Sequence, residues 1–176
     1  MIEGELINLR AREISDAERN ARWLNDPEVA RPLGERYLRS VVATEASLRE
    51  QGTRAGPDGD VWLAIETKAG QHIGNMRLFG VAPEDRSARV AIYVGDAEYR
   101  SKGYGTDAMR ALLRFAFEEM NLNRVELGVW DYNERAIASY RNCGFVEEAR
   151  RRQAHFERGS YHDAVTMAAL RDDWLP

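Results

Sequence analysis

The stretch Arg100-Ser101-Lys102-Gly103-Tyr104-Gly105-Thr106 decides how the fold is interpreted, because it joins a strand pattern at 88–94 to a long helix pattern at 105–121. Glycine lets the backbone turn tightly and approach a ligand closely. The amides that open a helix have no intrahelical partners, and the helix dipole favours negative charge there. The stretch therefore predicts an anion site suited to a pyrophosphate, with Arg100 and Lys102 adding positive charge at its rim.

Two other interpretations of the same stretch stay open at this point. One is a plain glycine turn that enters a helix beside two solvated basic residues. The other is a dinucleotide fingerprint, because Gly103-x-Gly105-x-x-Ala108 matches its relaxed form. That fingerprint needs its first glycine almost directly after the strand and an acid at the end of the next strand. Gly103 lies well beyond Val94, and the next strand ends at Val129-Trp130. The dinucleotide interpretation is therefore disfavoured.

A second feature lies in residues 133–145. Asn133 is placed to cap a helix, and Tyr140 follows seven residues later on the same helix face. Gly144 suits the left-handed position that closes the helix. Capping and packing would explain each residue singly. However, both features follow strands that flank the long helix, a crossover that makes those strands parallel neighbours. Ligands in open α/β sheets collect at such carboxyl ends.

The rest of the chain is typical of a mixed α/β sheet with the element order βααβββαβαββ, in one domain spanning residues 1–176. Ser15-Asp16-Ala17-Glu18 has the form of a capping box for a first helix, which Pro27 ends. A second helix is expected at 44–51, and turn-forming residues predict a loop at 52–60. The remaining runs predict strands at 5–10, 61–67, 72–79, 88–94, 125–129, 145–152 and 161–170.

Composition excludes several classes of protein. The chain of 176 residues has a formal net charge of −4, which argues against a nucleic-acid binder. No long apolar run or signal-peptide pattern is present, so a cytoplasmic protein without membrane attachment is expected. The three histidines and Cys143 lack metal-ligand spacing, and no metal is expected. The charge is mildly compatible with a cationic substrate.

Residues 99–145 resemble the GCN5-related N-acetyltransferase (GNAT) family. The family's loop, Gln/Arg-x-x-Gly-x-Gly/Ala followed by a helix, is matched at 100–105, and Asn133…Ala136…Tyr140…Gly144-Phe145 resembles its second block. Two further stretches are similar to the branch that includes ribosomal-protein N-terminal acetyltransferases and spermidine acetyltransferases. They are Trp23-Leu24-Asn25-Asp26-Pro27-Glu28-Val29 and Gly159-Ser160-Tyr161-His162-Asp163…Met167.

This resemblance implies the GNAT fold, a mixed and mostly antiparallel sheet with a central, splayed parallel strand pair and helices on both faces. It also implies acetyl-CoA as cosubstrate. The pantetheine arm is expected along the backbone of Tyr93, Val94 and Gly95, with Asn133 bonding or positioning it. Backbone amides would hold the pyrophosphate, and these belong to Ser101, Lys102, Gly103, Tyr104, Gly105 and Thr106.

The resemblance also implies direct attack of a neutral amine on the thioester. Tyr140 is then the catalytic residue, donating a proton to the leaving sulfur, and the Val94 amide is the expected oxyanion donor. Cys143 stands at a helix C-terminus, where the dipole disfavours a thiolate, so we interpret it as packing. No general base is nominated, because relatives carry glutamate at positions that are Val90 and Gly128 here. Glu66, Glu84, Asp85, His72 or a water relay remain available.

The amine acceptor is left open between a peptide α-amine, a polyamine, an aminoglycoside and an amino sugar. The family's acceptor cleft is shaped by the first helices and the last hairpin, which makes five residues candidates: Trp23, Arg31, Tyr37, His155 and Tyr161. A homodimer is the expected assembly by resemblance. The alternative function is a non-catalytic acyl-CoA-binding module, which would have no need of a proton donor at Tyr140.

Overall fold

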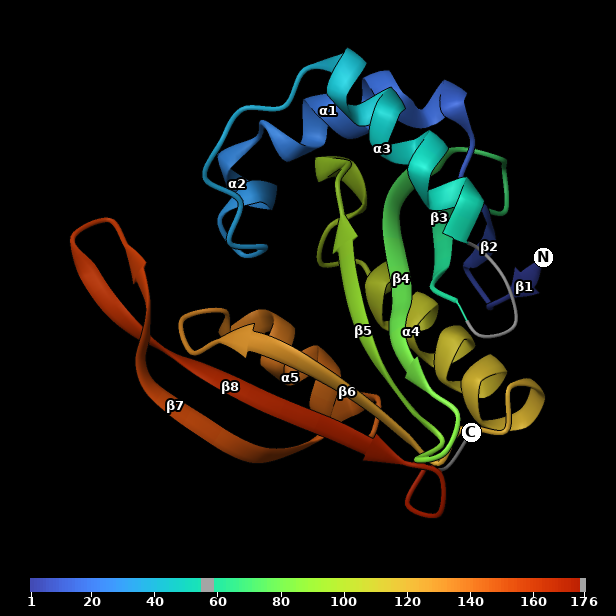
Figure 1. Ribbon diagram of the computed structural model, residues 1–176, viewed down its shortest axis with the longest axis vertical. Coiled ribbons are helices and arrows are strands. Elements are labelled where there is room, and N and C mark those ends of the chain that lie inside the picture. The colour runs from blue at the N-terminus through green and yellow to red at the C-terminus, as the bar shows by residue number, and fades with distance from the viewer. Residues whose placement is uncertain (55–58, 175–176) are drawn as a thin grey trace.

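The computed structural model describes residues 1–54 and 59–174, without the side chains of 52–54, and shows one eight-stranded sheet with helices on both faces (Figure 1). The strands are β1 (Ile2–Glu3), β2 (Ile7–Ala11), β3 (Val61–Thr67), β4 (His72–Ala82), β5 (Ser87–Val94), β6 (Arg124–Trp130), β7 (Val146–Glu157) and β8 (Ser160–Leu170). The α-helices are α1 (Ala17–Leu24), α2 (Pro27–Ala30), α3 (Val41–Arg54), α4 (Tyr104–Arg114) and α5 (Glu134–Asn142).

The strand order is β1-β2-β3-β4-β5-β6-β8-β7, and every neighbouring pair is antiparallel except β5 and β6. These two parallel strands are paired only at their beginnings, from Ser87 opposite Arg124 to Arg89 opposite Glu126. Beyond Arg89 they diverge, while β6 stays paired with β8 as far as Trp130. A gap therefore opens in the middle of the sheet at the carboxyl ends of β5 and β6 (Figure 1).

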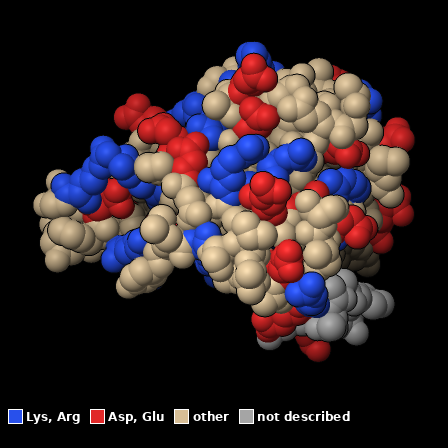
Figure 2. Space-filling view, turned by 90° about the horizontal axis from the view of Figure 1, so that it is seen from above, with Lys and Arg blue, Asp and Glu red and all other residues tan. Residues whose placement is uncertain are grey.

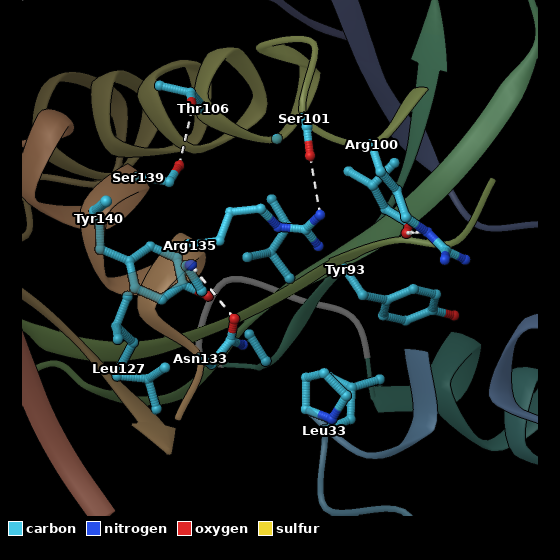
Figure 3. Close-up of a pocket in the computed structure, with 18 of the residues that line it drawn as sticks. Leu33, Tyr93, Arg100, Ser101, Thr106, Leu127, Asn133, Arg135, Ser139 and Tyr140 are labelled. Atoms are coloured by element: carbon cyan, nitrogen blue, oxygen red, sulfur yellow. Dashed lines mark hydrogen bonds between the residues drawn. The ribbon is translucent and has the colours of Figure 1, made fainter. Parts of the chain in front are cut away.

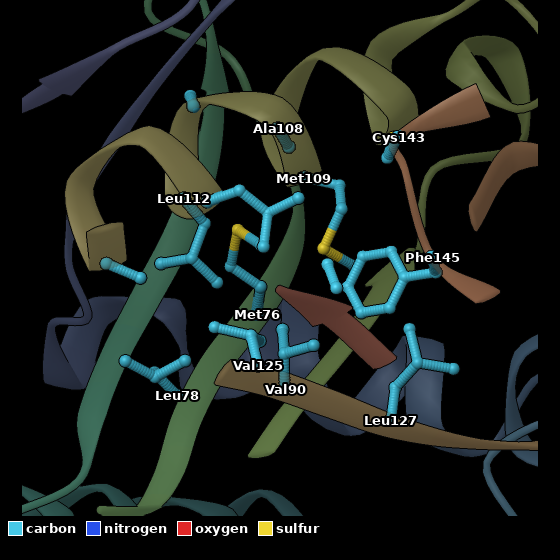
Figure 4. Close-up of a cluster of buried hydrophobic side chains, with 14 of the residues drawn as sticks. Met76, Leu78, Val90, Ala108, Met109, Leu112, Val125, Leu127, Cys143 and Phe145 are labelled. Carbon is cyan, nitrogen blue, oxygen red and sulfur yellow. The ribbon is translucent and has the colours of Figure 1, made fainter. Parts of the chain in front are cut away.

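The main hydrophobic core lies between the sheet and α4. Side chains alternate along a strand, so Met76 and Leu78 of β4 point to this face together with Val90 of β5. Helical spacing brings Met109 and Leu112 of α4 onto them, and Phe145 closes the cluster beside Leu127 (Figure 4). Each fully buried side chain of this size contributes about 1.5–3 kcal/mol. This packing fixes the start of α4 at the edge of the gap.

The opposite face of β4 and β5 is covered by α1. Asn75 of β4 donates to the Tyr93 hydroxyl of β5 over 2.7 Å and to the Asn20 side chain of α1 over 2.7 Å. Trp23 of α1 packs directly on Gly95, where an added Cβ would lie 2.1 Å from the indole. A residue without a side chain is therefore required at 95, and the end of β5 is pressed against the helical layer.

The predicted fold class is confirmed: the sheet is mixed and mostly antiparallel, its one parallel pair is central and splayed, and helices cover both faces. The capping-box prediction at Ser15 is wrong. A 3-10 turn at Ile14–Asp16 precedes α1, and the Glu13 amide donates to the Asp16 carboxylate over 2.8 Å instead. The sequence suggested Ser15 because local spacing cannot show that Asp16 is also held by Arg10 from β2.

Other boundaries differ in smaller ways. The helix expected at 44–51 is α3, which extends to Arg54, so the predicted loop at 52–60 is wrong at its start; residues 55–58 of that loop lie outside the described residues. The helix expected at 105–121 is α4 followed by a π-helical turn at Phe115–Glu119. The short elements β1 and α2 were not expected, since two and four residues carry too little periodicity to detect.

Seen from the side of α1 and α3, acidic and basic side chains are interspersed over the surface, and the β7–β8 hairpin projects as an arm (Figure 2). On this face the two charge signs alternate and do not form a basic patch. Among the described residues, no helix is both long and apolar enough to cross a membrane. The described side chains also include no group of three histidine, cysteine or carboxylate residues arranged to hold a metal ion.

Candidate active site

A pocket of about 400 Å³ occupies the gap between the diverging ends of β5 and β6. The α4 loop and α5 border one end, and the segment from α2 to Leu33 borders the other (Figure 3). Of the site residues predicted from sequence, nine line it: Tyr93, Val94, Arg100, Ser101, Gly103, Gly105, Thr106, Asn133 and Tyr140. Gly95, Lys102 and Tyr104 are not among the lining residues. Gly95 lies under Trp23, and Lys102 is exposed.

The loop before α4 is shaped by two residues with left-handed backbone conformation. Ser101 has φ 61° and Gly103 has φ 88°, and the Gly103 carbonyl accepts from the Asp107 amide as the helix begins. Successive turns of this kind point backbone amides into a shared concavity that binds anions. An L-residue at φ 61° is strained, and such strain collects where a ligand is held. The geometry suits the predicted pyrophosphate site.

Of the two basic residues expected at the rim of this loop, Lys102 is exposed to solvent and Arg100 is turned away from it. The Arg100 guanidinium turns inward, donating to the Val94 and Gly95 carbonyls over 3.2 and 2.6 Å and pairing over 2.9 Å with Asp26, the N-cap of α2. Arg135 of α5 instead reaches the loop and donates to the Ser101 hydroxyl over 2.9 Å (Figure 3). Sequence reasoning missed Arg135, although its place two residues after the Asn133 cap put it at the start of a helix facing the loop.

Backbone groups at the end of β5 face the gap in alternation. The Gly95 amide donates to the Ile73 carbonyl on β4, so the neighbouring Val94 amide and carbonyl point the other way, into the gap. The same alternation turns the backbone of Ile92 into the gap and that of Tyr93 toward β4. An extended ligand laid along this edge would therefore meet Ile92 and Val94, and Ile92 is a lining residue that the sequence analysis did not include.

Tyr140 lies in the pocket on the face of α5 that also carries Ala136 (Figure 3). Its ring packs against Phe145, with the two centroids 5.9 Å apart. Burial in this apolar setting raises the pKa of the Tyr140 hydroxyl to about 12, so the phenol stays protonated at neutral pH. Asn133 caps α5, its side-chain oxygen accepting from the Ala136 amide over 3.4 Å. The helix thus holds both residues at fixed places on the pocket wall.

Cys143 is buried beyond the pocket, and its sulfur lies 3.6 Å from the Thr106 carbonyl. Burial raises the pKa of its thiol to about 11, which removes the thiolate that a nucleophile would need. Next to it, the hydroxyls of Thr106 and Ser139 are 2.8 Å apart. These contacts join α4 to α5 and agree with a packing role for Cys143.

The five residues proposed for the acceptor cleft do not line the pocket that the described residues form. Trp23 is buried, with its ring edge-on to His72 at 4.9 Å, and His155 is stacked on Trp130 at 4.0 Å. Arg31 pairs with Glu157 over 3.5 Å. Tyr37 and Tyr161 are exposed. The wall is made instead by four residues of α2 and the segment after it: Glu28, Val29, Pro32 and Leu33.

The four groups considered as bases also lie outside the pocket lining. His72 is buried, with Nδ1 3.1 Å from the Asp16 carboxylate and Nε2 2.9 Å from the Gly74 carbonyl. Glu66 pairs with Arg10 over 3.3 Å. Glu84 and Asp85 occupy the exposed turn between β4 and β5. Each of these four groups is therefore held by structural partners or lies in solvent, away from the pocket.

Comparisons with known proteins agree with this architecture. Residues 7–146 match a family model described as an acetyltransferase (GNAT) domain. The chain is 32% identical over 105 residues to a putative ribosomal N-acetyltransferase (YdaF) of Bacillus subtilis, covering 60% of this chain and 57% of that protein. It is 31% identical over 113 residues to the spermidine N(1)-acetyltransferase of Vibrio cholerae, covering 64% of this chain and 65% of the relative. The aligned part is thus under two thirds of either relative.

The fold is also that of a solved spermidine N-acetyltransferase from Vibrio cholerae, crystallised with CoA and spermine. The TM-score is 0.87 at 24% sequence identity, over 97% of this chain and 99% of that one. At that identity the similarity describes the fold alone.

Proposed function

Because the chain belongs to the GNAT acetyltransferase family, we propose that it is an enzyme that transfers the acetyl group of acetyl-CoA to a primary amine. The family predicted from the loop at 100–105 and the block at 133–145 is thereby confirmed. The reaction forms an amide bond to the amine nitrogen, breaks the thioester, and releases CoA as its thiol. No metal takes part in this proposal.

One observation carries the proposal: a single pocket collects an anion-binding loop, a free strand edge and a buried hydroxyl donor. The left-handed loop at Ser101 and Gly103, the edge of β5 at Val94 that faces away from β4, and Tyr140 all line it, although they come from different parts of the chain. The pocket also opens between two parallel strands at their carboxyl ends, where α/β sheets bind ligands. The CoA in the structure of the Vibrio cholerae fold neighbour supports acetyl-CoA as the donor.

In this account the pyrophosphate of acetyl-CoA lies on the amides of residues 101–106, and Arg135 supplies positive charge beside it. The pantetheine arm extends along the β5 edge and meets the backbone of Ile92 and Val94, with Asn133 on the facing helix. The Val94 carbonyl already accepts from Arg100, so its amide is the free group of that residue. That amide then stabilises the oxyanion that forms when the amine attacks.

Tyr140 is proposed to donate its hydroxyl hydrogen to the departing sulfur. A phenol with a pKa of about 12 is a weaker acid than a thiol, whose ordinary pKa is about 8.5. Complete transfer from Tyr140 alone is therefore uphill, and a hydrogen bond to the developing thiolate is the favourable interaction. The nitrogen loses a proton when the amide forms, and this proton is taken up by the thiolate, so that CoA leaves as its thiol. The described lining residues include no histidine, and their one carboxylate, Glu28, is exposed on the α2 wall, so we propose that water carries the first proton from the amine.

The acceptor is proposed to be a small amine, on the strength of the spermidine acetyltransferase relative. A protein α-amine is the second candidate, which the putative ribosomal N-acetyltransferase relative supports. The alternative of a non-catalytic acyl-CoA-binding module is less favoured, because it gives no reason for a buried hydroxyl donor at Tyr140. A homodimer remains a prediction by resemblance, and a cytoplasmic location remains a prediction from the sequence pattern; light scattering on the purified chain tests the first.

The experiment that tests the function is thiol release from acetyl-CoA with a panel of amines and a blank without amine. The panel holds spermidine, Ala- and Ser-starting peptides, aminoglycosides and amino sugars. Release above the blank with one class is expected and names the acceptor. Binding of acetyl-CoA without release for any class would favour the binding module instead.

A further inference from the structure

Asp107, near the start of α4, binds the turn that joins β1 to β2. Its Oδ1 accepts from the Glu5 amide over 3.0 Å, and its Oδ2 accepts from the amides of Leu6 and Ile7 over 2.8 and 3.1 Å. Successive backbone amides that converge on one anion hold it firmly. This one carboxylate therefore joins the N-terminal segment of the chain to the helix that follows the candidate phosphate site.

The turn is shaped to receive this carboxylate. The Gly4 amide donates to the Ile7 carbonyl over 2.9 Å and closes the turn. A Cβ added at Gly4 would lie 2.4 Å from Asp107 Oδ2, so a larger residue there would displace the carboxylate. About two helical turns further along α4, the Arg114 guanidinium donates to the Glu3 carbonyl. The N-terminal segment is thus tied to α4 at two places, one near the loop before α4 and one far from it.

Asp107 also contacts the loop before α4 through its backbone. Its amide donates to the Gly103 carbonyl over 2.9 Å. Leu6 Cδ1 lies 3.7 Å from the position that a Cβ on Gly103 would take, so the turn at 4–7 lies beside the loop. Ser101 in this loop has a left-handed φ of 61°, a strained conformation that persists only where surrounding contacts fix it. Asp107 supplies such contacts from the side of β1 and β2.

The charge of Asp107 would oppose a bound pyrophosphate if the carboxylate were not held elsewhere. The amides that open a helix attract anions, and an acidic side chain near them competes for the same positive potential. Here the carboxylate is held by the three amides of residues 5–7. The amides of residues 101–106 therefore stay available to a ligand, while Asp107 keeps its structural contact.

We propose that Asp107 is a positioning residue for the cofactor: by binding the turn at residues 4–7, it fixes the loop before α4 so that its amides converge on the pyrophosphate of acetyl-CoA. This rests on the proposed function, because it assigns a support to the loop of the same site. A purely structural role would be to hold β1 and β2 in the sheet. Arg114 has that role at the far end of the same segment, so Arg114→Gln is the matched control.

The first test is calorimetric titration of CoA into the native chain and into the Asp107→Asn, Gly4→Ala and Arg114→Gln variants. Asp107→Asn keeps the side-chain size but leaves one oxygen for three amides. Loss of a negative charge near the pyrophosphate would by itself tighten CoA binding. The positioning role predicts the opposite, a Kd about three- to tenfold higher. Gly4→Ala, which keeps the charge, should also weaken binding, and Arg114→Gln should bind as the native chain.

Hydrogen exchange followed by mass spectrometry separates support of the loop from a general loss of stability. At a temperature where all variants are folded, Asp107→Asn should exchange faster at residues 101–106 as well as at residues 5–7. Arg114→Gln should exchange at the native rate at residues 101–106. The kcat of Asp107→Asn at saturating acetyl-CoA should stay within about twofold of the native value, because only cofactor binding is affected.

The two proposals fail in different ways. Unchanged or tighter CoA binding in Asp107→Asn overturns the positioning role, and so does faster exchange confined to residues 5–7. An equal loss of affinity in Arg114→Gln also overturns it, since that result indicates a general change in the fold. A native chain that does not bind CoA contradicts the proposed function, and the exchange at residues 101–106 then decides whether Asp107 holds the loop.

Discussion

Arg100 and Asp26 form an ion pair, with Nη2 and Oδ2 2.9 Å apart, that joins the strand end at Val94 to the helix α2. The pair connects the loop before α4 to the wall of the pocket that α2 forms. The Arg100 guanidinium also lowers the pKa of the Asp26 carboxyl below its usual range. Because the pKa of Asp26 is lower in the folded state than in the unfolded state, the ionised carboxylate stabilises the fold at any pH above its unfolded pKa. This stabilisation is lost only as the pH falls through the folded-state pKa, so the pair is intact at neutral pH.

We predict that Arg100→Gln lowers kcat/KM about tenfold, because the Val94 and Gly95 carbonyls and Asp26 all lose their partner. Asp26→Asn should have a smaller effect in the same direction. A double-mutant cycle of kcat/KM measures their coupling, and the double variant should be no worse than Arg100→Gln. Arg49→Gln, which breaks an exposed pair with Glu45 on α3, is the control. Full additivity would show that the two residues act separately.

Tyr140→Phe should reduce kcat about 10²- to 10⁴-fold while leaving the KM for acetyl-CoA nearly unchanged. The phenylalanine keeps the ring packing against Phe145 and removes only the donor to sulfur. Steady-state kinetics with the best amine of the panel, and equilibrium binding of CoA, separate the two effects. Unaltered kcat would remove Tyr140 from the mechanism.

The pH dependence of the reaction gives a second test of Tyr140. Its pKa is raised to about 12, so the hydroxyl stays protonated well beyond the ordinary value of 10. The rate should rise with pH as the free amine forms, and should not decline near pH 10. A profile of kcat/KM from pH 6 to 10.5 checks this. A decline with an apparent pKa of 9 to 10 that is missing in Tyr140→Phe would mean that the hydroxyl is not shielded from water.

Gly103→Ala should weaken acetyl-CoA binding by about tenfold or more. The added Cβ has room, with Leu6 Cδ1 as its nearest neighbour at 3.7 Å, so the harm comes from the backbone. At φ 88° an L-residue is strained by about 1–2 kcal/mol, and relaxation would turn the loop amides away. Gly70→Ala is the matched control, since φ is 84° in a hairpin turn far from the pocket. Equal stability loss in both variants with unchanged affinity in Gly103→Ala would contradict the phosphate loop.

Arg135→Gln should raise the KM for acetyl-CoA about three- to tenfold and weaken its dependence on salt, because a cation beside the pyrophosphate is lost. Arg141→Gln, on the same helix and pointing to Glu147, should leave the KM unchanged. Kinetics at two ionic strengths measure both effects. If the KM for acetyl-CoA is unchanged in Arg135→Gln as well, the loop amides hold the phosphates without Arg135.

The sequence allowed the fold to be predicted because its strongest local signals coincide with the elements that make the pocket. Gly103, Asn133 and Gly144 occupy backbone positions that their residue types favour, namely a left-handed turn, a helix cap and a helix end. The long apolar periodicity of 105–121 identified α4, and a crossover helix dictates a parallel strand pair.

The acceptor side could not be predicted in the same way. Trp23 and His155 are aromatic and seemed suited to ligand contact, but tertiary packing buries them against His72 and Trp130. Nothing near Arg100 in the sequence predicts an ion-pair partner for it. Its partner Asp26 is distant in the sequence and is brought to it only by folding. Nothing in the sequence around Glu28 predicts that it lines the pocket, because this depends on how α2 packs against the rest of the chain.

The most direct test of the central claim is mass spectrometry of the amine after incubation with acetyl-CoA and the native chain. The account predicts an acceptor heavier by the mass of one acetyl group, formed in equal amount to the free thiol and strongly reduced with Tyr140→Phe. Thiol released without an acetylated amine, or the same yield from Tyr140→Phe, would contradict it.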